Sequence, residues 1–109
     1  PPFNAVVSIA GGDALPGWNA PSEADWFRSA CDESSKALWG KPAMRIGEGG
    51  SIPILNLFEA QFPRAQFAVT GVLGPGSNAH NADESLDLAY TEKFIAAVGY
   101  LAASIPEEA

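Results

Sequence analysis

The strongest constraint on the fold is an alternation, along the chain, of short apolar runs with longer segments of helical periodicity. A β-branched run at residues 5–10 precedes a helical pattern at residues 22–40. Two more short apolar runs, at residues 43–46 and 66–70, are each followed by another helical pattern. Strand-like runs that alternate with helices favour a layered α/β architecture. We therefore expect an α/β fold in the order strand, helix, strand, helix, strand, helix.

The predicted helices carry start and stop signals. The first helix is predicted to begin at the capping-box-like run Ser22–Asp25, and Gly40 followed by Pro42 ends its apolar pattern. Ser51 is suited to capping a second helix, which Pro63 closes. Periodic apolar residues predict the last helix from about Leu88 to Ser104.

The charge of the chain excludes one class of partner. Thirteen acidic and six basic residues give a net charge of −7, and the basic residues are scattered. A nucleic-acid partner is not expected, because phosphate binding needs clustered Lys and Arg. A membrane partner is not expected either, since no apolar run approaches membrane-spanning length. The single cysteine, Cys31, rules out an internal disulfide and is expected to be a buried thiol.

The only histidine, His80, lies in a loop of small and turn-forming residues at positions 71–83. A neutral imidazole is a good zinc ligand, and the small neighbours would let the backbone present the ring to a cleft. Glu84 follows four residues later, where its carboxylate could support a metal-bound histidine. The loop alone favours the alternative, a surface histidine that binds nothing, because a lone histidine without a spaced partner is a poor metal signal.

A second polar loop, Glu48-Gly49-Gly50-Ser51, precedes the second predicted helix. Its glycines permit close backbone approach, and the free N–H groups of the helix start could bind a carboxylate or phosphate together with the Ser51 hydroxyl. Glu48 could accept an ammonium group. The alternative is a simple turn in which Ser51 only caps the helix. The loop is not a phosphate-binding P-loop, because it lacks the Lys-Ser/Thr pair.

The two loops together resemble a known family. The order is Arg45-x-Gly-Glu48-Gly-Gly-Ser51-Ile-Pro, a helix, an apolar strand, Gly74-Pro-Gly-Ser-Asn-Ala-His80-x-x-x-Glu84 and a final amphipathic helix. This order resembles the C-terminal part of the dinuclear zinc exopeptidases, which include carnosine dipeptidases, aminoacylases and acetylornithine deacetylases. The resemblance covers nearly the whole chain. The GGSIP run with Glu before it is most similar to the dipeptidase branch.

The resemblance implies a domain division and an assembly. Residues 1–12 would be the end of a lid domain that dimerises, with the last lid strand at the N-terminus. Residues 13–109 would be the C-terminal segment of the layered catalytic peptidase domain. It further implies a cytoplasmic enzyme that forms a homodimer as the full-length protein.

The resemblance also implies roles for residues. His80 matches the last metal ligand of a two-zinc site, in which cobalt or manganese are alternative ions, and Glu84 would lie beside it. Glu48 would face the amino end of the substrate, and Ser51, with the backbone of Gly49 and Gly50, its carboxylate. The family's general base and other metal ligands belong to its N-terminal half. We therefore expect no catalytic residue in this segment.

These roles predict a metallopeptidase that hydrolyses the amide bond of dipeptides or N-acyl amino acids through a metal-activated water. The segment alone is expected to be inactive and to bind zinc weakly, because zinc sites take three or four protein ligands. One alternative is a metal-free, non-enzymatic relative or binding module of the same fold. Another is a small autonomous acidic domain with an unrelated role.

Overall fold

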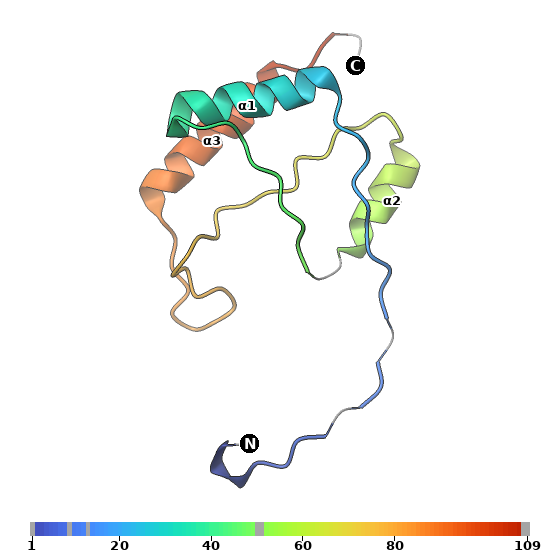
Figure 1. The fold of residues 1–109 in the computed structure, drawn as a ribbon, viewed down its shortest axis with the longest axis vertical. Coiled ribbons are helices and arrows are strands. Elements are labelled where there is room, and N and C mark those ends of the chain that lie inside the picture. Colours follow the sequence, from blue (N-terminus) through green and yellow to red (C-terminus); the bar gives the residue numbers. More distant parts are fainter. Residues whose placement is uncertain (1, 9, 13, 50–51, 108–109) are drawn as a thin grey trace.

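The computed structural model describes residues 2–8, 10–12, 14–49 and 52–107. A short 3₁₀ segment, η1 (Pro2–Asn4), is followed by three α-helices: α1 (Asp25–Trp39), α2 (Pro53–Gln61) and α3 (Leu88–Ala103). Helices α1 and α3 pack against each other, whereas α2 lies apart from this pair (Figure 1). The chain between the helices runs in long irregular segments, and the N-terminal residues extend away from the helices (Figure 1).

The predicted α/β architecture is wrong. The described parts of residues 5–10, 43–46 and 66–70 contain no strand and form no sheet, and Ile9 of the first run lies outside those parts. Among the described residues, 43–49 and 66–73 take part in no backbone–backbone hydrogen bond. A strand exists only when a neighbouring strand accepts and donates those bonds, so an apolar β-branched run is not sufficient for one.

Helix α1 differs from its prediction at the N-terminal end and agrees with it at the C-terminal end. Ala24, not Ser22, is the N-cap, and it makes no side-chain capping bond. The backbone N–H of Ala24 instead donates to Oε1 of Gln66 at 2.7 Å. At the other end, the prediction is confirmed: Gly40 adopts φ 76°, and its N–H donates to the carbonyl of Lys36. A left-handed residue at this position ends the helix with little steric cost because glycine has no Cβ.

The other two helices lie close to their predicted positions. Asp87 caps α3 by accepting a hydrogen bond from the backbone N–H of Tyr90 at 2.9 Å. Helix α2 has Pro53 in its first turn, as predicted, and its N-cap residue is Ile52, without a side-chain capping bond. The predicted cap, Ser51, lies outside the described residues.

The core between α1 and α3 is small. Among the described residues, its buried apolar side chains are those of Phe27, Ala30 and Ala97. Tyr100 on α3 reinforces this contact by donating its hydroxyl to Oε2 of Glu33 on α1 at 2.7 Å. The exposed surface is 8969 Å², compared with about 5,800 Å² for a compact monomer of the same mass. Most large apolar side chains of this chain are therefore in contact with solvent.

Two further expectations from the sequence concern Cys31 and the membrane. The Cys31 thiol is half-buried rather than fully buried, and this burial raises its pKa. Within the parts that the structure describes, no helix is long and apolar enough to cross a membrane.

Candidate functional site

The loop that carries His80 is held at its base by Ser77. Ser77 is buried, and its hydroxyl accepts a hydrogen bond from the backbone N–H of Gly74 at 3.0 Å. The backbone N–H of Ser77 donates to the carbonyl of Gly74 at 3.1 Å, and its carbonyl accepts from the N–H of Ser85 at 2.9 Å. Both ends of the loop are thus tied to one residue.

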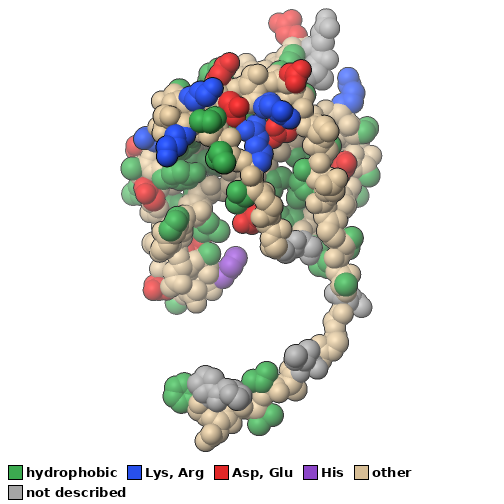
Figure 2. Space-filling model, in the orientation of Figure 1, with side chains coloured by type: hydrophobic (Ala, Val, Ile, Leu, Met, Phe, Trp, Pro, Cys, Tyr) green, Lys and Arg blue, Asp and Glu red, His purple; other side chains and the backbone are tan. Residues whose placement is uncertain are grey.

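The tip of the loop adopts an unusual backbone conformation. Asn78 and His80 both have positive φ, 52° and 66°. Asparagine and histidine both adopt this region more often than most residues do, although a side chain with a Cβ still carries a steric cost there. Asn81 supports this conformation, because its side-chain amide donates to Oδ1 of Asn78 at 2.9 Å. The histidine side chain (purple in Figure 2) is exposed and projects from the surface of the loop.

Glu84 contacts the backbone of His80. Its Oε2 accepts a hydrogen bond from the His80 backbone N–H at 3.2 Å. Across the described ranges, no group of three or more His, Cys, Asp or Glu side chains is placed to hold a metal ion. These residues therefore do not by themselves fit a complete zinc site, and His80 could supply only a single imidazole to one.

The second predicted site lies before α2. Glu48 and Gly49 are exposed and belong to an irregular segment, while Gly50 and Ser51 lie outside the described residues. Among the described side chains, no hydrogen bond or ion pair joins Glu48 to His80. The assigned roles of Glu48, Gly49, Gly50 and Ser51 in binding substrate remain predictions.

Arg45, three residues before Glu48, belongs to a charged cluster that the sequence did not reveal. Nε and Nη2 of Arg45 donate to Oε1 and Oε2 of Glu23 at 2.9 and 3.0 Å. Nη1 of Arg45 donates to Oδ1 of Asp32 at 2.8 Å. Arg28 also approaches Glu23, with Nε 3.3 Å from Oε2. We call Arg45, Glu23, Asp32 and Arg28 the Arg45 cluster.

The charges of the Arg45 cluster stabilise one another. Hydrogen bonds from Arg45 lower the pKa of Glu23, and the charges of Arg45 and Arg28 lower it further. Arg45 likewise lowers the pKa of Asp32. The two carboxylates in turn raise the pKa of Arg45. The partners of Arg45 are 22 and 13 residues away in the chain, so no local pattern could have indicated this cluster.

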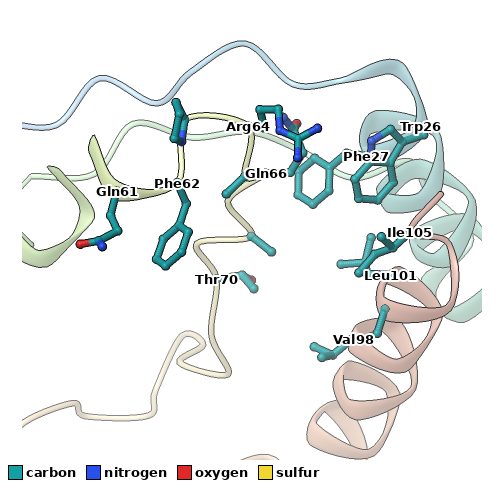
Figure 3. Close-up of a pocket in the computed structure, with 14 residues that line it drawn as sticks. Trp26, Phe27, Gln61, Phe62, Arg64, Gln66, Thr70, Val98, Leu101 and Ile105 are labelled. Carbon is teal, nitrogen blue, oxygen red and sulfur yellow. The ribbon is translucent and has the colours of Figure 1, made fainter. Parts of the chain in front are cut away.

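A largely apolar hollow of about 730 Å³ lies between the α1–α3 pair and the segment after α2 (Figure 3). Trp26 and Phe27 contribute to it from α1, and Val98 and Leu101 from α3. Phe62 lies on the facing segment (Figure 3). Glu48, Gly49, His80 and Glu84, the predicted site residues that the structure describes, do not line this hollow.

No protein-family model matches this chain. The chain is 34% identical, over 90 residues, to a cysteinylglycine-S-conjugate dipeptidase of Corynebacterium striatum. The matched part is 79% of this chain but only 19% of that protein.

This similarity relates the chain to one segment of a protein that is named as a dipeptidase. It does not distinguish the branches of the exopeptidase family that the sequence resembles. It also does not favour a metal-free binding module, since the matched protein is named as an enzyme.

Proposed function

We propose that this chain is a segment of a metallopeptidase that hydrolyses the amide bond of dipeptides. The observation that carries the proposal is the 34% identity to a dipeptidase across 79% of the chain. N-acyl amino acids are the second substrate class to be tested, because they share the same amide bond and carboxylate. The chain spans only 19% of that relative, so this proposal concerns the activity of the whole protein.

The proposed substrate contacts are charge-complementary. Glu48 would bind the substrate ammonium group, and Gly49, Gly50 and Ser51 would bind its carboxylate. Two features support these roles: Glu48 is exposed, and α2 follows it without an acidic residue in its first turn. The partial positive charge of a helix start then favours an anion at this point.

Zinc is the proposed cofactor, with cobalt or manganese as alternatives, and His80 would be the one ligand from this chain. Zinc ions supply a water of lowered pKa and stabilise developing negative charge on oxygen. The remaining ligands and the general base would belong to polypeptide outside this chain. We further propose that residues 1–12 belong to a lid domain, that residues 13–109 belong to the catalytic domain, and that the whole protein is a cytoplasmic homodimer.

The experiment uses the full-length protein. Hydrolysis of dipeptides and of N-acyl amino acids would be measured before and after treatment with a chelator. Glu48→Gln should lower kcat/KM for dipeptides about tenfold or more, equivalent to about 1.4 kcal/mol, with a smaller loss for N-acyl substrates that lack the ammonium group. Glu92→Gln, an exposed position on α3, is the matched control. Equal losses on both substrate types would reject the role of Glu48, and hydrolysis that survives the chelator would reject the metal.

A further inference from the structure

The segment that carries Glu48 has few means of attachment to the rest of the molecule. Residues 43–49 make no backbone–backbone hydrogen bond within the described chain. The large apolar side chains of the segment do not anchor it either, since Met44 is 84% exposed and Ile46 79% exposed. The position of the segment must therefore depend on its polar side chains.

Arg45 makes the contacts that the rest of the segment lacks. Its guanidinium binds both carboxylate oxygens of Glu23 and one of Asp32, and Nη1 also donates to the carbonyl of Ala43 at 3.0 Å. Asp32 lies within α1, and Glu23 lies two residues before the first residue of this helix, Asp25. The planar guanidinium thus attaches the segment to the start and the middle of one helix. A planar fork fixes direction as well as distance, which a lysine ammonium cannot do.

We propose that Arg45 is a positioning residue, which fixes the segment 43–49 on α1 and thereby places the Glu48 carboxylate for substrate. The effect on substrate rests on the proposed function, whereas the attachment to α1 does not. Glu48 follows Arg45 by three residues, which limits their Cα separation to about 11 Å. Holding Arg45 on α1 therefore keeps the Cα of Glu48 within that distance of a point that is fixed on the helix.

The attachment is tested in the 109-residue chain by backbone ¹⁵N relaxation. In the unsubstituted chain we expect residues 44–48 to approach the order of α1. Arg45→Met should lower their order parameters below about 0.6, the range of flexible backbone, while α1 stays rigid. Arg45→Lys should give an intermediate loss. Arg28→Met removes the peripheral cation and should leave the segment ordered.

A double variant keeps this test decisive. Glu23→Gln with Asp32→Asn retains shape but removes both charges, and it should loosen the segment as Arg45→Met does. Order parameters that stay unchanged in Arg45→Met and in this double variant would overturn the proposal. An equal loss in Arg28→Met would also overturn it, because the effect would then follow general charge rather than the fork.

The role toward substrate is tested in the full-length enzyme. Arg45→Met should raise KM for dipeptides about tenfold, with a smaller change in kcat and partial rescue by Arg45→Lys. In a Glu48→Gln background the same substitution should add little, because both changes remove one contact. Additive losses would overturn the positioning of Glu48. Absence of all peptidase activity would reject the proposed function and this role toward substrate, while the order parameters would still decide the attachment to α1.

Discussion

The backbone N–H of His80 donates to Oε2 of Glu84 at 3.2 Å, so the glutamate holds the main chain of the predicted metal ligand. His80 adopts φ 66° at this point, a left-handed conformation that is costly for a residue with a side chain. The Glu84 carboxylate accepts the hydrogen bond of the N–H at this turn. Its structural contribution is therefore to stabilise the conformation that projects the imidazole.

Glu84→Ala should loosen the tip of the loop and disturb the presentation of His80. Glu84→Gln retains an oxygen that can accept the same hydrogen bond and should have a smaller effect. In the full-length protein we expect zinc affinity to fall about tenfold or more for the alanine variant, the size found for residues that orient metal ligands. Competition with a chromogenic chelator measures the zinc affinity of each variant. Equal zinc affinities of the alanine variant and Glu92→Ala would show that the contact does not support a metal site.

The 109-residue chain should bind zinc only weakly, because one imidazole supplies a single ligand where proteins use three or four. Calorimetric titration of the chain should show no tight stoichiometric binding, and His80→Ala should remove the residual heat. Tight binding at a ratio of one zinc per chain, retained in His80→Ala, would contradict the assignment of His80 as the zinc ligand of this chain.

Acid should weaken the Arg45 cluster. Arg45 lowers the pKa of both Glu23 and Asp32, so folding makes these groups harder to protonate. Their contribution to the free energy of unfolding is fully present above the unfolded pKa values, about 4.3 for Glu and 3.9 for Asp. It is lost as the pH falls from there through the lower pKa values of the folded state.

Urea unfolding followed by circular dichroism between pH 3 and 7 measures this dependence. The unsubstituted chain should lose stability as the pH falls below about 4.5. The double variant Glu23→Gln with Asp32→Asn should show a smaller decrease over the same range. Parallel curves for the two proteins would contradict a contribution from the Arg45 cluster.

Features that depend on neighbouring residues in the chain could be predicted from the sequence. Periodic apolar residues located the helices, and the glycine at position 40 marked the end of α1 because a left-handed cap needs no partner elsewhere in the chain. Turn-forming residues around His80 correctly indicated an exposed loop. The 34% identity to a dipeptidase supports the resemblance to that family, which the two loops had indicated.

The sequence failed where structure depends on distant residues. The expected strands do not form in the described residues, because each strand would need a hydrogen-bonding partner that an apolar run cannot specify. The capping box at Ser22 was wrong because Gln66, 42 residues along the chain, satisfies the backbone N–H of Ala24 instead. The same limit hid the pairing of Arg45 with Glu23.

Removing the cap of α3 should destabilise the small core that this helix shares with α1. Asp87 Oδ1 accepts from the backbone N–H of Tyr90, and the Asp87 carbonyl accepts from the hydroxyl of Thr91 at 2.7 Å. Asp87→Ala should lower the free energy of unfolding by about 1 kcal/mol, since a backbone N–H of the first turn loses its acceptor. Asp87→Asn should cost much less because asparagine caps as well as aspartate.

Thermal unfolding followed by circular dichroism measures the difference between these two variants. Because α1 and α3 form the core together, we expect a single transition that moves to lower temperature in Asp87→Ala. Asp83→Ala, which alters a nearby carboxylate in the preceding loop, separates the cap from a general effect of charge near the helix start. If Asp87→Asn were as unstable as Asp87→Ala, the negative charge and not the capping hydrogen bond would stabilise α3.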